Sequence, residues 1–330
     1  MTAPSTGSET KPDKATRPVL AEADPQEPDW ESSEAETKTV SAAEVAGAAA
    51  TGSPRQRERA LEEVLSKANL EEVKKALAWA SSLPEGPMKK AALEKILKRW
   101  GELDGPGATA YAAQIYEETG NANFLREALA GWAEKDPQEA VNQLASLGLS
   151  EGLQRDIRRD LLEQWADLNP AAAAAYAVAN RNPDSWRGLV GAVADEWSKR
   201  DPQAAANWAA SLDAGRDKRA AIYSAISNWA DADLNGAASY ISSQPPGESR
   251  DTMAGTLARY VGQADPAAGL KWAAMVADPA TQERAVAGAL VDLYRTDTNQ
   301  AVQLLQKSGI SAQVQQAALS RMTNRGPWWR

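Results

Sequence analysis

The stretch W-S-K-R-D-P-Q-A-A-A-N-W, from Trp197 to Trp208, sets the pattern for most of this 330-residue chain. Its first half returns in related form after Trp132, Trp165 and Trp229. The Asp or Asn residues of these copies follow one another at intervals of 32 or 33 residues. A fixed period of that length is typical of stacked supersecondary units, so we predict a repeat protein.

Each copy contains a joint between two helices, for which Asp201-Pro202 is the model. An Asp or Asn side chain can accept a hydrogen bond from an unpaired N–H at a helix start, and Pro suits the first helical position because it lacks that N–H. We name the helix that begins at each joint helix A and the helix that ends just before it helix B. Counting by the period places the cap residues at Glu72, Asp104, Asp136, Asn169, Asp201, Asp233, Asp265 and Asp297.

Side-chain size varies regularly within each repeat. Helix B has apolar residues at i, i+3, i+4 and i+7, which indicates one buried face. One copy of this face is Ile222, Ala225, Ile226 and Trp229. The fourth residue after each cap is always small, as at Ala205, and predicts a close helix crossing. The seventh is mostly a ring, as at Trp208; we interpret these rings as core, although a ladder of rings can also stack on sugars or bases.

We therefore predict an all-α fold, a right-handed superhelical solenoid of αα-hairpins with some 17 helices and no strand. It comprises about eight 32-residue repeats after an N-terminal half-repeat. Residues 1–54 hold ten acidic and four basic side chains and few large apolar ones. We expect them to form a disordered acidic tail, because they bury too little apolar surface to offset the entropy of ordering. The solenoid is predicted over 55–325 and a Trp-rich C-terminal tail over 326–330.

Composition excludes several classes of site. The chain has no Cys and no His, so thiolate chemistry, disulfides and histidine-based catalysis are impossible. Its net charge is −9 and the sequence shows no basic stripe, so we expect no nucleic-acid partner. No apolar run reaches the length of a membrane span. The first four residues lack the features of a signal peptide, which favours the cytoplasm for the sequence as given and export only if a leader preceded it.

The joints resemble those of a known family, the Ala-rich helical-repeat proteins of bacteria such as Verrucomicrobia and Planctomycetes, built on W-A-x-x-D-P-x-A-A-x-W-A. Matching segments are 132–140, 165–174, 197–209 and 265–273, and the resemblance covers roughly 56–323. It implies a structural motif in a mostly uncharacterised protein, often exported. The chain is also loosely similar to tetratricopeptide repeats. It departs from them in period and in lacking W-x-x-L-G-x-x-Y, so their peptide-binding residues cannot be carried over.

Candidate binding residues come from two places. The sixth residue after a cap adjoins the ring position yet is often polar, and these residues could offer hydrogen bonds to an extended partner or simply be solvated. Trp328 and Trp329 follow a Gly-Pro breaker and could anchor a partner or cover the end of the last hairpin. The residues of the first kind are Asn142, Asn207, Ser239 and Lys271.

A row of cations recurs ten residues before the B-helix Trp position. Because cations oppose the dipole at a helix N-terminus, we expect each to pair with a carboxylate of a neighbouring repeat, with a ligand-binding edge as the alternative. The row consists of Lys90, Arg155, Arg187 and Arg219.

These patterns favour a non-catalytic scaffold that binds a protein or peptide partner, with no cofactor or metal. One alternative is an αα-barrel enzyme acting on carbohydrate through two carboxylates, for which Asp195 with Glu196 or Asp231 with Asp233 are candidates. Another is a structural subunit of a larger assembly.

Overall fold

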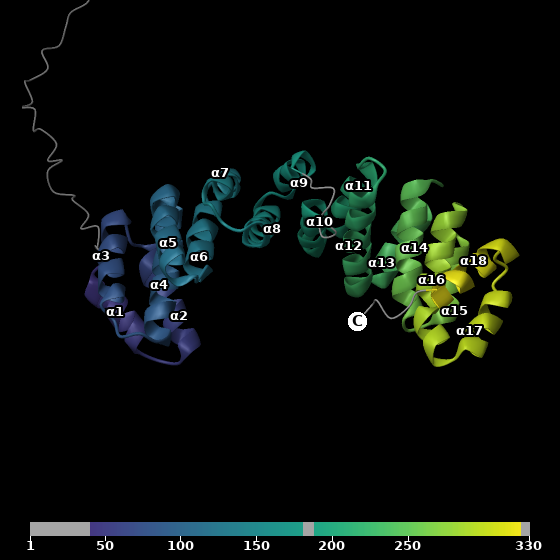
Figure 1. Cartoon of the computed structure of the whole chain (residues 1–330), viewed down its shortest axis with the longest axis horizontal. Coiled ribbons are helices and arrows are strands. Elements are labelled where there is room, and N and C mark those ends of the chain that lie inside the picture. The colour runs from purple at the N-terminus through teal and green to yellow at the C-terminus, as the bar shows by residue number, and fades with distance from the viewer. Residues whose placement is uncertain (1–39, 181–187, 325–330) are drawn as a thin grey trace, which may run out of the picture. The chain divides into compact units, whose positions relative to one another are not determined.

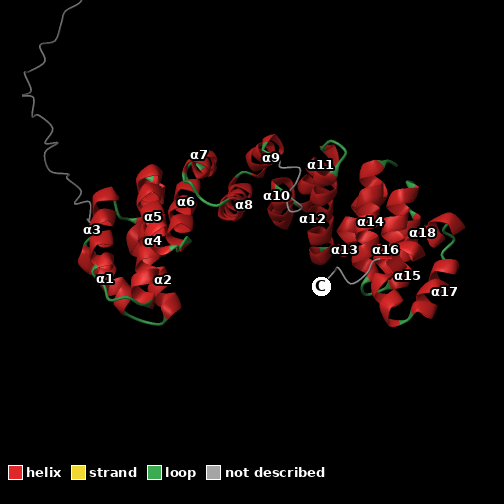
Figure 2. Ribbon diagram, in the orientation of Figure 1, coloured by secondary structure: helices red, strands yellow, loops and turns green. Residues whose placement is uncertain are grey.

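The computed structural model describes residues 40–180 and 188–324, and this part of the chain contains helices and no strand (Figures 1 and 2). The prediction of an all-α fold is confirmed. The helices are α1 Ala42–Ala50, α2 Pro54–Ser66, α3 Leu70–Ser81, α4 Pro87–Leu103, α5 Gly105–Thr119, α6 Asn123–Ala133, α7 Pro137–Gln143, α8 Glu151–Leu168, α9 Pro170–Ala179, α10 Leu189–Arg200, α11 Pro202–Ser211, α12 Arg216–Ala232, α13 Leu234–Ser243, α14 Glu248–Gly262, α15 Pro266–Ala274, α16 Pro279–Thr296, α17 Thr298–Gln306 and α18 Ala312–Asn324, with a 3₁₀ turn at Leu144–Ser146.

Seven of the predicted joints share one geometry. At Asp104 the backbone N–H donates to Trp100 O at 2.7 Å, which ends α4, and Oδ1 accepts from Gly107 N–H at 3.0 Å, which begins α5. The Trp100 indole also donates to Asp104 Oδ2 at 3.2 Å. One residue thus closes a B helix and caps the next A helix. The same two hydrogen bonds, one donated by the backbone N–H of the cap and one accepted by its side-chain oxygen, are made at Asp104, Asp136, Asn169, Asp201, Asp233, Asp265 and Asp297.

The eighth predicted cap, Glu72, is wrong. Helix α3 begins three residues earlier, capped by Asn69, whose Oδ1 accepts from Glu72 N–H at 3.1 Å. Glu72 completes a reciprocal capping box, since its Oε2 accepts from Asn69 N–H at 2.8 Å. Its other oxygen accepts from Val40 N–H at 2.8 Å. The side chain of Glu is too long to cap the helix that follows it as Asp does. Asn69, three residues earlier, is therefore the cap.

The expected disordered tail overlaps a helix. Helix α1 lies within the predicted range 1–54, so the prediction is wrong for that part, and the fold includes residues from Val40 onward. A Ser41–Glu44 capping box begins α1. Its apolar residues Val45 and Ala49 are buried, and the helix packs on α2 and α3. Two buried side chains and a local cap thus order a stretch whose composition alone indicated disorder. Apart from α1, the described α-helices number the 17 predicted.

Extensive contacts join only helices that are one or two elements apart in the chain. The A helices α5 to α15 each pack on both neighbouring B helices, α3 packs on α4 and α17 packs on α16. The B helices α2 to α18 form an unbroken series of even-numbered neighbours. Their predicted apolar face is the core, for example Ile222, Ala225 and Ile226, all fully buried. The rings meet in pairs across the joints, with centroids 5.0–5.7 Å apart; the pairs are Trp100–Tyr111, Trp165–Tyr176, Trp197–Trp208 and Trp229–Tyr240.

Small residues allow the closest helix crossings. The fourth residue after each of the seven confirmed caps is small and buried, as expected for a close helix crossing, and so is Ala76, which was counted from Glu72. The seven are Ala108, Ala140, Ala173, Ala205, Ala237, Gly269 and Ala301. Between α4 and α6 the approach is closer still. A methyl group on Gly131 would lie 1.9 Å from Lys98 O, and one on Gly101 would lie 2.1 Å from Ala128 O. Only glycine permits this crossing, because any Cβ would meet backbone that cannot move independently.

Polar side chains also join neighbouring repeats, but they are not the cations predicted from the sequence. Lys90 pairs within its own helix, with Glu94, at 3.7 Å. Arg155 and Arg219 have no acidic partner among the described residues, and Arg187 lies outside them. The expected pairing of this row is therefore wrong where it can be examined. Bonds between repeats are made instead by Lys95–Glu62, Lys98–Glu134, Arg126–Asp160, Arg200–Asp167 and Arg321–Glu283.

The joint geometry predicts the effect of removing a cap. Asp201→Ala should lower the free energy of unfolding by about 1 kcal/mol, because the Ala204 N–H loses its acceptor. Urea unfolding followed by circular dichroism measures this change. Glu58→Ala, on the exposed surface of α2, is the control and should change stability by less than about 0.5 kcal/mol. Equal effects of the two substitutions would contradict the assigned role of the cap.

The close crossing predicts opposite effects at two glycines. Gly131→Ala should lower stability by about 1–3 kcal/mol, since α4 and α6 must separate to admit the methyl group. Gly152→Ala, in α8, meets no atom within 4 Å and should be neutral or stabilise the protein by up to about 1 kcal/mol through helix propensity. Melting temperatures of the two variants measure these changes in stability. A Gly131→Ala variant as stable as the Gly152→Ala variant would disprove the tight contact.

Candidate functional site

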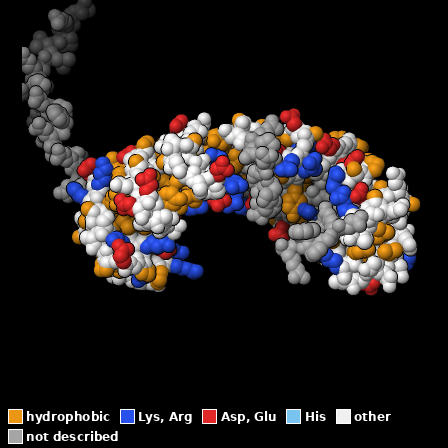
Figure 3. All heavy atoms as spheres, in the orientation of Figure 1, with side chains coloured by type: hydrophobic (Ala, Val, Ile, Leu, Met, Phe, Trp, Pro, Cys, Tyr) orange, Lys and Arg blue, Asp and Glu red, His pale blue; other side chains and the backbone are white. Residues whose placement is uncertain are grey.

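An open groove of about 950 Å³ crosses the B helices α8, α10, α12, α14 and α16. It lies on the side of these helices that does not face the core. Lys and Arg side chains gather on the visible surface around α11, α12 and α14 (Figure 3). A smaller cavity of about 230 Å³ shares Arg259 and Arg284 with the groove and extends to α18. The groove is thus a feature of several successive repeats.

The floor of the groove is made of small side chains. Gly191 of α10, Ala220 of α12 and Gly255 of α14 all line it. A methyl group on Gly191 would meet Ala220 Cβ at 3.7 Å, and one on Gly255 would meet Ala285 Cβ at 3.4 Å, both ordinary contacts. Neither glycine is required for helix packing, so their small size leaves the groove open rather than relieving a clash.

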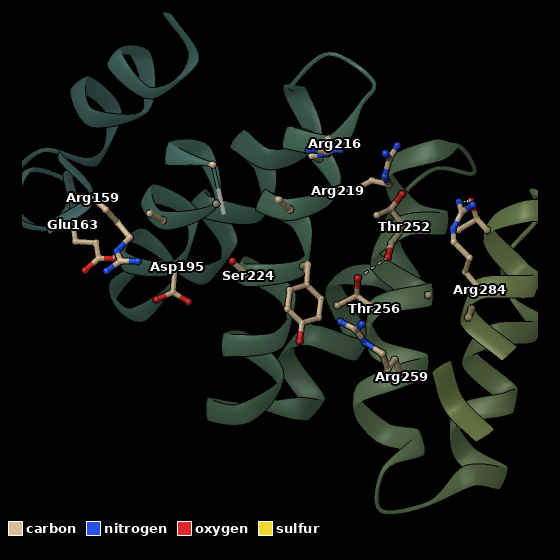
Figure 4. A pocket seen from close by; sticks show the side chains of 18 residues that line it. Arg159, Glu163, Asp195, Arg216, Arg219, Ser224, Thr252, Thr256, Arg259 and Arg284 are labelled. Carbon is tan, nitrogen blue, oxygen red and sulfur yellow. Dashed lines mark hydrogen bonds and ion pairs between the residues drawn. The ribbon is translucent and has the colours of Figure 1, made fainter. Parts of the chain in front are cut away.

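Charged side chains form two rims (Figure 4). The first rim, from the N-terminal parts of α12 and α16, has Arg216, Arg219 and Arg284. The second rim lies farther along the helices. It consists of Glu163, Asp195 and Arg259, from α8, α10 and α14. The groove is therefore mixed in charge at its α8–α10 end and basic at its α12–α16 end.

At the α8–α10 end the charges are paired with one another. Arg159 Nε lies 3.6 Å from Glu163 Oε1. Asp195 Oδ2 lies 3.6 Å from Lys199 Nζ, and its Oδ1 accepts from Asn228 Nδ2 at 3.1 Å. Burial raises the pKa of Glu163 above its usual value; Arg159 opposes this shift, whereas the nearby Asp160 and Asp195 carboxylates add to it. Both carboxylates that line the groove, those of Glu163 and Asp195, therefore already have partners.

At the α12–α16 end three guanidinium groups lack a carboxylate partner among the described residues: those of Arg219, Arg259 and Arg284. All three residues are exposed. The Arg259 guanidinium carbon lies 4.2 Å from the centroid of the Tyr223 ring, and Tyr223 is itself 46% exposed. Arg284 donates to Thr281 Oγ1 at 2.7 Å. Two of the three arginines are thus held in place by neutral partners and form no ion pair among the described residues. The Arg284 charge still acts on Asp278, whose pKa is lowered by hydrogen bonds from Thr281 and, to a smaller extent, by Arg284.

The residues predicted to bind a partner lie elsewhere. Asn142, Asn207, Ser239 and Lys271 are exposed residues of the A helices α7, α11, α13 and α15, and none lines the groove. The structure brings Asn207 to a neighbour of the next repeat, since the Tyr240 hydroxyl donates to its Oδ1 at 2.6 Å. Trp328 and Trp329 lie outside the described residues.

The suggested carboxylate pairs have structural partners. Lys199 lies 2.5 Å from Glu196, beside its contact with Asp195. Asp233 caps α13. Asp231 Oδ1 accepts from the Tyr260 hydroxyl at 3.1 Å. The described residues contain no group of three acidic side chains that could hold a metal ion, and none of their helices has the length and apolarity to cross a membrane.

No family model matches the chain, and no curated protein or solved structure is significantly similar to it. The geometry of the groove is therefore the basis for any functional argument.

Of the three groove arginines, only Arg219 belongs to the row of cations for which the sequence offered a ligand-binding edge as the alternative, because the other two occupy different positions in their repeats. Arg219 and Arg284 lie 14 and 13 residues before the caps of their repeats, whereas Arg259 lies 6 residues before its cap. Aligning the B helices by their caps could have found the signal: Gly191 and Gly255 occupy one common position, ten residues before the cap.

The raised pKa of Glu163 predicts a dependence of stability on pH. The folded state holds the proton of this carboxyl more tightly than the unfolded state does. The contribution of Glu163 to the stability of the folded state therefore falls as the pH rises above about 4.5. Glu163→Gln removes this titration. We expect the wild type to lose stability relative to the variant between pH 4.5 and 7, as measured by urea unfolding across that range.

Glu58→Gln, on an exposed surface, provides the control and should leave the shape of the pH profile unchanged. A wild type that gained stability relative to the Glu163 variant over the same interval would show that the Arg159 ion pair outweighs burial.

Proposed function

We propose that the chain is a right-handed superhelical αα-hairpin solenoid of about eight repeats that acts as a non-catalytic protein-interaction scaffold. The near-neighbour packing of the helices supports this, because a solenoid is held together by contacts between adjacent repeats. The recurring cap geometry supports it as well, since the same joint returns at seven places.

The observation that carries the proposed function is the groove across five successive B helices. Packed helices lie about 8–10 Å apart, so four steps span about 32–40 Å. An extended peptide rises about 3.3 Å per residue and would cover that distance with about ten to twelve residues. The groove is open to solvent along a line of small side chains, which suits an extended segment of a protein partner.

An enzymatic alternative rests on Glu163 and Asp195, two carboxylates in one groove. Catalytic pairs of this kind need one carboxyl that is free to protonate a leaving group and another that is free to attack or to activate water. Here Arg159 engages Glu163, while Lys199 and Asn228 engage Asp195. This network favours a structural role for both side chains and supports the scaffold over the enzyme.

The proposed function can be tested by filling the groove. Gly255→Leu places a larger side chain on the floor at a position where Cβ makes only ordinary contacts. Affinity capture from a lysate of the source organism, followed by mass spectrometry, should recover partner proteins with the wild type and lose them with this variant.

Ala175→Leu is the matched control, since it adds the same bulk to an exposed position of the A helix α9. Partners retained by this variant and lost by Gly255→Leu would support the groove as the binding site. Partners lost only with Ala175→Leu would favour the A-helix surface with Asn142 and Asn207. Retention of every partner by both variants would count against a scaffold acting through either surface.

A further inference from the structure

The basic end of the groove indicates the chemistry of its partner. We propose that it binds an extended acidic segment of a partner protein, with acidic side chains at every third position. This inference rests on the proposed scaffold function and specifies the ligand of that site. It is carried by the three arginines without carboxylate partners among the described residues, Arg219, Arg259 and Arg284.

The absence of an ion pair among the described residues distinguishes these arginines from others between neighbouring repeats. Arg200 lies 2.5 Å from Asp167, and Arg321 lies 2.6 Å from Glu283. By contrast, Arg259 packs over Tyr223 and Arg284 donates to a threonine hydroxyl. A guanidinium held by a neutral partner keeps donors free for a carboxylate and loses less conformational entropy on binding. Arg259 and Arg284 are thus oriented, and all three side chains are exposed and without an ion pair among the described residues.

Their placement defines the spacing of the acidic groups. Arg219, Arg259 and Arg284 come from α12, α14 and α16, which pack in succession. Neighbouring helices lie about 8–10 Å apart, the rise of about three residues of an extended chain. A peptide that crosses the helices therefore meets one arginine at every third residue.

The two rims explain why the peptide should be extended. Arg219 and Arg284 belong to the first rim, whereas Arg259 lies on the second rim (Figure 4). Side chains of an extended chain alternate between two sides, so residues i and i+6 point to one side and residue i+3 points to the other. Acidic residues at i, i+3 and i+6 would thus reach Arg219, Arg259 and Arg284 in turn. A polyproline II peptide would direct all three to one side, which does not match this arrangement.

The charge at the other end of the groove favours a peptide over nucleic acid. A nucleic-acid strand carries negative charge at every phosphate, so one following the groove would meet the carboxylates of Glu163 and Asp195. A peptide can confine its acidic residues to the segment that crosses α12 to α16. The groove therefore matches a ligand whose charge is placed locally.

The test uses the full chain and two fluorescein-labelled peptides of equal composition and charge. One carries Asp-Ala-Ala-Asp-Ala-Ala-Asp between Gly-Ser flanks, and the other carries the three aspartates in succession between the same flanks. Fluorescence anisotropy at low ionic strength should give an affinity about tenfold higher for the spaced peptide. Added salt should weaken this binding because the contacts are exposed ion pairs.

Substitution of the arginines identifies the contacts. Arg219→Gln, Arg259→Gln and Arg284→Gln should each weaken binding about two- to fivefold, the range of exposed ion pairs, and the triple variant more than tenfold. Arg155→Gln is the matched control, since Arg155 is also exposed and without an ion pair among the described residues but does not line the groove. Circular dichroism verifies that every variant is folded.

Three results would overturn the proposal: equal binding of the two peptides or binding of neither, a loss with Arg155→Gln as large as with Arg259→Gln, or tighter binding of a single-stranded oligonucleotide of equal charge. The last result would assign the groove to nucleic acid. The scaffold function is judged separately. Partners captured by the wild type and by the triple arginine variant, but lost with Gly255→Leu, would preserve the scaffold and refute the acidic ligand.

Discussion

The structure depends on the hydrogen bond by which an Asp or Asn side chain accepts the third N–H of an A helix while its own N–H closes the preceding B helix. At Asp104 and Asp201 one residue satisfies both helix ends, which otherwise leave unpaired polar groups. Because the joint has the same backbone shape in seven copies, each A helix departs from its B helix in the same way. Equivalent faces then meet repeat after repeat, and their buried residues form two core clusters that divide within α8.

Small side chains have two separate consequences in this fold. At Gly131 the absence of Cβ allows α4 and α6 to cross with their backbones in contact. At Gly191 and Gly255 it leaves space in the groove that crosses the B helices. The groove floor and the helix crossings thus both depend on small side chains, in which this Ala-rich and Gly-rich sequence abounds. The longer arginine side chains surround that floor and supply the positive charge from which we infer an acidic partner.

Much of the fold was predictable because its determinants are local. The caps follow from an Asp or Asn side chain three residues from the N–H that it accepts, and the core face follows from helical periodicity, as in Ile222 and Ile226. Prediction failed where a residue acted through distant contacts. Glu72 bonds the N–H of Val40, 32 residues away, and Val45 is buried by α2 and α3 rather than by its own helix. The candidate site residues predicted from the sequence, such as Asn207, lie on the A helices, whereas the cavity lies on the B helices.

The sequence by itself determined the period, the all-α class, the joints and the side of each B helix that is buried, since these depend on residues within one or two turns of each other. Only the tertiary structure decided which arginines stand together. Arg219, Arg259 and Arg284 are far apart in the chain and occupy different positions relative to their caps, so no local pattern links them. Stacking of α12, α14 and α16 brings them to one groove, where none of the three forms an ion pair with a carboxylate among the described residues. Which charges remain unpaired is a property of the packed repeats, because ion pairs form across helices rather than along the sequence.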